Sequence, residues 1–224
     1  MKILSLIPAR GGSKRLPGKN IKLLGGKPLI EWSIEISKNV PEICETLVST
    51  DDPETQIISQ KAGGLVPWLR PKELAKDNTR SVEVVIHALN WYEKLHGSVD
   101  GILLLQPTSP FRTVETVRNG INLFLKNNKI AVVSISPAKS KKNLLFKIDN
   151  GYLTPFTENI DKNSCFPKNG YYINGCFYMI TPNDLRKYND FVIPNTYGLE
   201  ITSEKESIDI DTEDDWSIAL SYLN

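Results

Sequence analysis

Apolar residues in this chain fall into short runs that alternate with amphipathic stretches up to about residue 135. Residues 3–7 and 101–106 form mostly apolar runs with the length of buried strands. Residues 81–95 instead repeat their apolar side chains at helical spacing, as in Val82, Val85 and Leu89. This alternation is typical of βα units. The sequence therefore predicts an α/β fold with a mostly parallel sheet flanked by helices.

The same pattern places the other elements. Further strands are expected at residues 46–50 and 130–135, and further helices at 28–37, 54–62 and 114–126. After about residue 136 the regularity falls away, and we expect an excursion from the sheet that contains a hairpin over 146–153, because Asn150-Gly151 favours a tight turn. A strand over 172–180, a short helix from Pro182 and a last helix over 212–223 then follow.

Length and composition bound the organisation of the chain. Its 224 residues lie within the range of one large α/β unit, with neither an internal repeat nor a low-complexity linker. We therefore expect a single domain spanning residues 1–224. Its composition, 40% hydrophobic and 24% charged residues, is that of an ordinary globular protein.

Several classes of function and location are disfavoured. A net charge of +1 provides no general attraction to nucleic acid or anionic lipid, and the apolar run at 102–105 is too short to cross a membrane, so we expect no partner of either kind. The three cysteines, Cys44, Cys165 and Cys176, include no CxxC pair, which argues against a disulfide framework and a zinc site. The start of the chain reads as a first strand instead of a signal peptide, so we expect a cytoplasmic protein.

A loop rich in glycine and basic residues follows the first predicted strand, over residues 8–20. Glycines let backbone N–H groups approach an anion closely, and cations neutralise a polyphosphate. The loop therefore predicts a phosphate-binding cradle; the alternative is a solvated basic loop. It is not a Walker A loop, because Gly12 and Gly18 are six positions apart and Asn20 stands where that motif needs Ser or Thr. The cradle residues are Arg10, Gly11, Gly12, Ser13 and Lys19.

Two carboxylates alternate with isoleucines near the end of the chain, in the segment 208–211. On a strand, Asp209 and Asp211 would lie on one side and the isoleucines on the other. Two converging carboxylates suit a hard cation with oxygen ligands, so the pair predicts a magnesium site. The alternative is helix capping, which accounts for residues 212–215 whatever the two aspartates do.

A third cluster follows the predicted strand at 101–106. Gln106, Thr108 and Ser109 offer neutral hydrogen-bonding groups at the carboxyl end of a strand, where ligands bind in open α/β sheets. Such groups suit the hydroxyls or carboxylate of a sugar acid. The alternative is that Thr113 caps the next helix and two prolines stiffen the turn.

Taken with their order in the chain, these segments resemble the acylneuraminate cytidylyltransferase family, whose members make CMP-activated sialic and related nine-carbon acids. The resemblance covers essentially the whole chain. It rests on the strings PARGGSKRLPGKN, VSTDD, LRPKELAKDNT, LLQPTSPFRT, NGCFYM and SIDIDTEDDW.

The resemblance implies a Rossmann-like nucleotidyltransferase fold, CTP as donor and Mg²⁺ as cofactor. The anomeric hydroxyl of the sugar acid would attack the α-phosphate, and pyrophosphate would leave. By position, the nucleotide would be bound by Ala9, Arg10, Gly11, Gly12, Ser13, Lys19, Asn20, Arg70 and Ser81. The sugar acid and reacting phosphates would be bound by Gln106, Thr108, Ser109, Asn174 and Gly175, and magnesium by Asp209 and Asp211. Arg10, Lys19, Asp209 and Asp211 would be the catalytic residues, and no general base is assigned.

Relatives of this kind tend to be dimers joined through an irregular segment, here about residues 137–171. The chain departs from the family pattern at Tyr172, where many relatives carry an arginine, and Lys168 is a candidate replacement. The lysine that the irregular segment contributes is either Lys141 or Lys142. Two alternatives stay open: a Kdo-type or other sugar nucleotidyltransferase, which the string RLPGK also suggests, and a catalytically silent nucleotide-binding protein.

Overall fold

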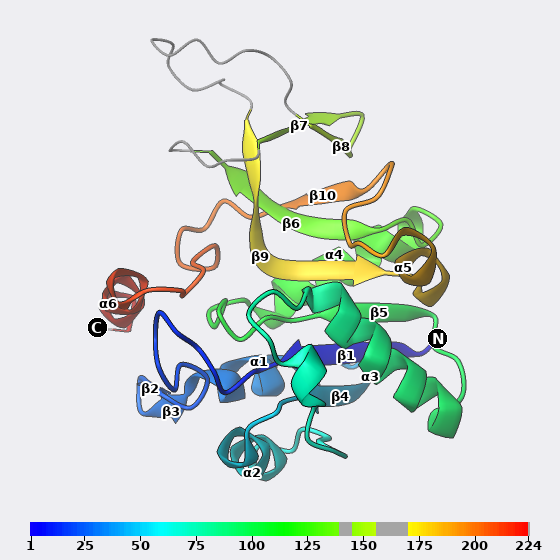
Figure 1. Ribbon diagram of the computed structural model, residues 1–224. Helices are drawn as coiled ribbons and strands as arrows, with labels where there is room; N and C mark the ends of the chain where they lie inside the picture. Colours follow the sequence, from blue (N-terminus) through cyan, green and yellow to red (C-terminus); the bar gives the residue numbers. More distant parts are fainter. Residues whose placement is uncertain (139–144, 156–169, 224) are drawn as a thin grey trace.

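A computed structural model describes residues 1–138, 145–155 and 170–223, and its ribbon is drawn in Figure 1. Eight of its strands form one sheet in the order β4-β1-β5-β9-β6-β10-β8-β7, and β2 with β3 forms a small hairpin. The strands are β1 (Ile3–Pro8), β2 (Leu23–Leu24), β3 (Lys27–Pro28), β4 (Ile43–Ser49), β5 (Gly101–Leu104), β6 (Val132–Pro137), β7 (Phe146–Asp149), β8 (Tyr152–Pro155), β9 (Tyr171–Ile180) and β10 (Tyr197–Glu200). The helices are α1 (Leu29–Lys38), α2 (Pro53–Lys61), the 3₁₀ turn η1 (Lys72–Leu74), α3 (Ser81–His96), α4 (Val114–Lys126), α5 (Pro182–Tyr188) and α6 (Glu213–Ser221).

The prediction of a mostly parallel sheet was wrong, because the sheet is mixed. β4, β1 and β5 run parallel, as do β6 and β10, but β9 lies antiparallel between β5 and β6. β7 pairs with both β8 and β9, so the second half of the sheet closes on itself. Burial on both faces makes a strand apolar whichever way it runs, so the residues of β9 give no information about its direction.

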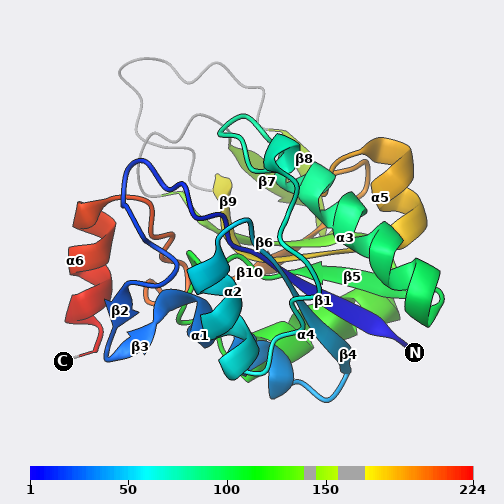
Figure 2. The ribbon, with the colours of Figure 1, turned by 60° about the horizontal axis from the view of Figure 1, so that its bottom comes forward.

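Helices cover both faces of the sheet. Alternate residues of β1 point to opposite sides: Ile3 and Ile7 pack with α1 and α4, whereas Leu4 and Leu6 pack with α3. Figure 2 shows α3 and α5 on one side of the sheet and α1 and α4 on the other. These two apolar layers hold β1 and β5 in place. Because the two strands are parallel, the polar loops that follow them leave the sheet at the same end.

Local sequence explains where these elements begin and turn. Thr113 caps α4 by accepting a hydrogen bond from the Thr116 N–H, and Thr212 forms a capping box with Asp215 at α6. The predicted hairpin is confirmed, because Asn150-Gly151 turns β7 into β8 with positive φ at both positions. The strand expected over 208–211 is not formed, since those residues are an extended segment without ladder pairing.

Helix α4 offers a test of how tightly the layers fit. Gly120 faces the ring of Phe177 on β9, and a Cβ at this position would lie 2.4 Å from the Phe177 Cζ. Gly120→Ala should therefore lower the free energy of unfolding by about 1–3 kcal/mol, although alanine is the better helix former. Urea denaturation measures this value. Asn119→Ala, on the exposed side of the same helix, is the control and should change stability little; equal effects of the two would contradict the packing.

Candidate active site

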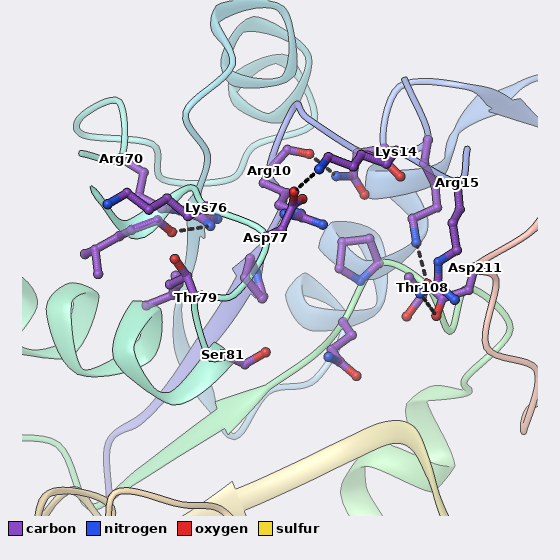
Figure 3. A pocket seen from close by; sticks show the side chains of 18 residues that line it. Arg10, Lys14, Arg15, Arg70, Lys76, Asp77, Thr79, Ser81, Thr108 and Asp211 are labelled. Atoms are coloured by element: carbon purple, nitrogen blue, oxygen red, sulfur yellow. Dashed lines mark hydrogen bonds and ion pairs between the residues drawn. The ribbon is translucent and has the colours of Figure 1, made fainter. Parts of the chain in front are cut away.

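A cavity of about 690 Å³ opens where β1 and β5 end, beside the first residue of α3. Six basic side chains and two carboxylates line it, so its electrostatic potential is positive. Figure 3 shows the charged side chains converging from the basic loop, the segment before α3 and the segment before α6, while the turn after β5 contributes Thr108. The basic ones are Arg10, Lys14, Arg15, Lys19, Arg70 and Lys76, and the acidic ones are Asp77 and Asp211.

Two of the cations are held by one carboxylate of the segment before α3. Arg10 Nη1 lies 2.7 Å from Asp77 Oδ1, and Lys14 Nζ lies 2.5 Å from Asp77 Oδ2. Hydrogen bonds from Lys14 and then Arg10 lower the pKa of Asp77 below its ordinary value. The carboxylate is therefore charged, and it occupies the side of the cavity where the basic loop presents its cations.

A second pair of cations shares Asp211. Lys19 Nζ is 2.9 Å from Asp211 Oδ1 and also donates to the Ile210 carbonyl oxygen, while Arg15 Nη2 is 2.8 Å from Asp211 Oδ2. Partial burial acts to raise the pKa of Asp211, but the hydrogen bond and charge of Lys19, with those of Arg15, outweigh it and hold that pKa below its ordinary value. The contacts bring together the two sequence-predicted clusters at opposite ends of the chain.

The glycines of the basic loop differ in their surroundings. The Gly11 N–H donates to Asp51 Oδ1 at 3.1 Å, and a Cβ at Gly11 would lie 2.7 Å from the Asp52 Cβ. Gly11 therefore serves close packing of the loop onto the start of α2. Gly12 is exposed and a Cβ there would meet nothing within 4 Å, but Gly12 does not line the cavity, so its contact with a phosphate stays a prediction. Ser13 lines the cavity directly.

Two further residues of the predicted nucleotide site, Ala9 and Asn20, lie at the two ends of the basic loop. The side chain of Ala9 is fully buried in the core, so only its backbone is available to a ligand. Asn20 is 8% exposed and donates from Nδ2 to the Arg10 carbonyl oxygen at 3.0 Å, while also lining the cavity. This bond ties the two ends of the basic loop together.

Arg70 and Ser81 form the other end of the cavity. Arg70 is buried and donates from Nε to Ser49 Oγ at 3.0 Å and from Nη2 to the Ser49 carbonyl oxygen. Burial lowers its pKa to about 10, with Asp51 opposing the change and Arg10 adding to it, so the guanidinium stays charged. Ser81 is the first residue of α3, where helix N–H groups favour an anion or a polar ligand.

The turn after β5 is held from behind by a buried cation. Arg112 is 2% exposed, and it donates from Nη2 to the Gln106 carbonyl oxygen at 2.5 Å and from Nη1 to Ser33 Oγ at 3.0 Å. Ser33 Oγ also contacts the same carbonyl oxygen, at 3.4 Å. The Gln106 backbone is thus fixed, while its side chain and Thr108 face the cavity.

β9 approaches this turn through the predicted Asn-Gly pair. Asn174 is buried, and its amide bonds Ser134 Oγ, Ser136 Oγ and the Cys176 N–H within the sheet. The amide thus has partners inside the protein, and its role as a substrate contact stays a prediction. Gly175 has φ +84° and lies against the side chain of Gln106, since a Cβ there would be 3.0 Å from Gln106 Oε1.

Ser109 and Asp209 lie near Gly175. Ser109 is fully buried, and its Oγ has no hydrogen-bond partner within the described residues, so it lies beneath the turn instead of in the cavity. A Cβ at Gly175 would be 3.9 Å from the Asp209 Cγ. The Ile210 N–H donates to the Thr108 carbonyl oxygen at 2.8 Å, which attaches the segment that carries both aspartates to the turn after β5.

Two of the smaller cavities that share lining residues with the main one extend the site. A cavity of about 370 Å³ shares Ser81 and Gln106 with it and is otherwise lined mainly by apolar and aromatic side chains, including Tyr178 and Phe191. A cavity of about 480 Å³ shares Arg15 and Asp211 and contains Asp209. Gln106 and Asp211 therefore stand at the two boundaries of the main cavity.

Sequence reasoning singled out neither Asp77 nor Arg112. The basic stretch 70–80 contains two carboxylates, Glu73 and Asp77, and nothing in the sequence distinguishes Asp77. An arginine directly after the apolar residue of a proline-rich turn was the signal for Arg112. Lys141, Lys142, Lys168 and Cys165 lie outside the described residues.

The close approach of β9 to Gln106 can be tested with two glycines of positive φ. Gly97, after α3, has φ +78° and ψ 176°, a backbone region used almost only by glycine, and open space around its Cβ direction, so Gly97→Ala should cost only the backbone strain, about 1–3 kcal/mol. Gly175→Ala should cost roughly 1 kcal/mol more, because the methyl group also displaces the Gln106 amide. Chemical denaturation of both variants measures the difference; indistinguishable losses would rule out the tight contact.

Comparisons with known proteins agree on one family. The sequence model of the Cytidylyltransferase family matches residues 4–162. CMP-N,N'-diacetyllegionaminic acid synthase of Legionella pneumophila subsp. pneumophila strain Philadelphia 1 is 38% identical over 97% of this chain and 94% of that protein. N-acylneuraminate cytidylyltransferase of Escherichia coli O18:K1:H7 strain RS218 is 31% identical over 98% of this chain and 52% of that protein.

A solved structure has a similar fold. A CMP:2-keto-3-deoxy-manno-octonic acid synthetase complexed with CTP superposes with a TM-score of 0.75 at 18% identity, over 100% of this chain and 98% of that one. No helix in the described ranges is both long enough and apolar enough to span a bilayer. With a family match over most of its length and a full-length relative at 38% identity, this chain belongs to the cytidylyltransferase family.

Proposed function

We propose that this enzyme transfers CMP from CTP to the anomeric hydroxyl of a nine-carbon sugar acid, of the legionaminic or sialic acid type, and releases pyrophosphate. One observation carries the proposal: the basic cavity, the two carboxylates Asp209 and Asp211, and the Gln106 turn lie next to one another. The named activities of the relatives at 38% and 31% identity support the same reaction.

The main cavity suits a nucleoside triphosphate. Arg10, Lys14, Arg15 and Lys19 would neutralise the phosphates at one end. Arg70 and Ser81 lie at the other end, where the buried guanidinium and the start of α3 would receive the polar edge of a base. A volume of about 690 Å³ is within the range of small-ligand sites.

The cavity of about 370 Å³ suits the acceptor. It meets the triphosphate cavity at Gln106 and Ser81, so an acceptor in it would place a hydroxyl beside the phosphates. Tyr178 and Phe191 give it apolar faces, and Arg80 gives it a cation for a carboxylate. Arg80 already pairs with Asp190 at 3.0 Å, so an acceptor carboxylate would compete with that aspartate.

The donor set at Asp209 and Asp211 fits magnesium. No group of three or more His, Cys, Asp or Glu side chains gathers in the described part of the chain, which disfavours an all-protein cage. Magnesium commonly binds one or two carboxylates together with substrate phosphates and water, and two carboxylates at the cavity border meet that need. When bound there, the ion would neutralise charge on the reacting phosphates.

The chain itself would act by positioning. In the reaction the acceptor oxygen forms a bond to the α-phosphorus, the bond from that phosphorus to the pyrophosphate oxygen breaks, and the acceptor hydroxyl loses its proton. Such transfer depends on alignment and on neutralisation of charge, so no nucleophilic side chain is required. Lys19 and Arg10 would stabilise the charge that develops on the leaving pyrophosphate.

Assembly and location belong to the proposal. A dimer joined through about residues 137–171 follows from the resemblance, and residues 139–144 and 156–169 of that segment lie outside the described ranges. One domain spanning residues 1–224 and a cytoplasmic location are proposed from the sequence pattern.

Two other functions are weaker candidates. A Kdo-type enzyme shares the fold, but at 18% identity the likeness to the solved synthetase concerns the fold alone. A silent nucleotide-binding protein would not need two carboxylates at the border between the triphosphate cavity and its neighbour.

The reaction is tested by incubating the protein with CTP, Mg²⁺ and one acid at a time from a panel of legionaminic, pseudaminic, sialic and Kdo acids. Pyrophosphate release should require both the acid and CTP, and should be fastest with a nine-carbon acid. Release with Kdo alone would favour the Kdo-type alternative, and release with none of the acids would count against an enzyme.

Asp211 carries a second prediction. Asp211→Asn should lower turnover by at least about 100-fold, because it removes a charge that would hold magnesium, while thermal melting still shows a folded protein. Asp214→Asn is the matched control, since Asp214 is exposed in the first turn of α6 and lines none of the three cavities. Near-normal turnover of Asp211→Asn would remove this residue from the metal site.

A further inference from the structure

Asp77 bridges two cations of the basic loop. Each of its carboxylate oxygens contacts a different cation of the basic loop, Oδ1 with Arg10 at 2.7 Å and Oδ2 with Lys14 at 2.5 Å. Figure 3 shows the carboxylate between these two side chains at the border of the cavity. Two cations that bind one bridging carboxylate have the arrangement they would need for two oxygens of a phosphate.

The ion pairs of Asp77 are weak enough to be exchanged. The side chains of Arg10, Asp77 and Lys14 are 35%, 46% and 80% exposed, and exposed pairs contribute only about 0–1 kcal/mol each. A polyphosphate carries more negative charge than a carboxylate and can displace it.

The segment that carries Asp77 is also loosely attached. Between η1 and α3 it forms no helix or strand, and Lys76, Asp77 and Asn78 are all exposed. The backbone around Asp77 is held locally, as by the Thr79 N–H to the Lys76 carbonyl oxygen at 3.2 Å, and Arg80 anchors only the end of the segment, through Asp190. A segment with little buried surface moves at low cost in free energy.

We propose that Asp77 is an internal counter-anion that competes with phosphate groups for Arg10 and Lys14. Phosphates displace it when the nucleotide binds, and it returns to both cations when pyrophosphate leaves. The carboxylate thus weakens pyrophosphate binding and promotes release of that product. This role rests on the proposed function only in naming pyrophosphate as the product; the competition itself concerns any polyphosphate in the cavity.

Calorimetry with sodium pyrophosphate, in the absence of magnesium, tests the competition directly. Asp77→Asn should bind pyrophosphate about 3- to 10-fold more tightly than the unchanged protein, because two exposed ion pairs no longer have to be broken. Asp77→Glu keeps the charge and should stay near the unchanged protein. Added salt should reduce the difference, since it screens the exposed pairs.

Two further variants separate the proposal from a general charge effect. Glu35→Gln changes the net charge by the same amount at an exposed pair with Lys27, and neither of these residues lines the cavity, so it should leave the affinity unchanged. In a Lys14→Gln background, the gain from Asp77→Asn should shrink, because one of the two competed cations is gone.

The outcomes distinguish the role of Asp77 from the phosphate cradle and from the cytidylyltransferase reaction. A gain no larger than that of Glu35→Gln, or weaker binding by Asp77→Asn, would overturn the role of Asp77 while leaving the cytidylyltransferase reaction intact. Failure of every variant to bind pyrophosphate would overturn the phosphate cradle and the role of Asp77 with it. Tighter binding together with stronger inhibition of turnover by pyrophosphate would support both.

Discussion

The hydrogen bonds of the buried Arg112 guanidinium fix the turn on which the rest of the site is built. Arg112 binds the Gln106 carbonyl oxygen and Ser33 from inside the protein, where unused donors of a charged group are costly, and its Nε is without a partner in the described part of the chain. The turn so fixed presents the Thr108 carbonyl oxygen to the Ile210 N–H, and the next residue, Asp211, binds Lys19. One set of contacts therefore runs from a buried cation, through the turn after β5, to the basic loop.

Much of the fold follows from local patterns. Apolar periodicity located most of the elements, including α4 at its observed bounds, because burial of one face or of both faces leaves a repeating signal. The direction of β9 could not be found this way, and neither could β10, whose burial is only intermediate. Segment 208–211 has the alternation of a strand, yet its isoleucines pack beside α6 while its backbone pairs with a turn.

The site was predictable where charge and glycine gather in the sequence. Arg10, Lys19 and Asp211 meet in the cavity as their motifs indicated. Asp77 was not predictable, because a single exposed carboxylate acquires its meaning only from the two cations that the fold places beside it. Direct contacts from Ser109 and Asn174 were inferred from motif position alone, which cannot tell a side chain that faces a ligand from one that supports the strand behind it.

The small core beneath the basic loop has a consequence for biosynthesis of the protein. Leu16 and Leu24, near the start of the chain, pack with Ile210 and Trp216 near its end. While the chain is being synthesised, the basic loop is made about 190 residues before the segment that covers its apolar underside. The loop therefore stays without its packing partners, and without Asp211 beside Lys19, until residues 208–216 have been made. Competence to bind nucleotide in the native way is thereby delayed until that segment has left the ribosome.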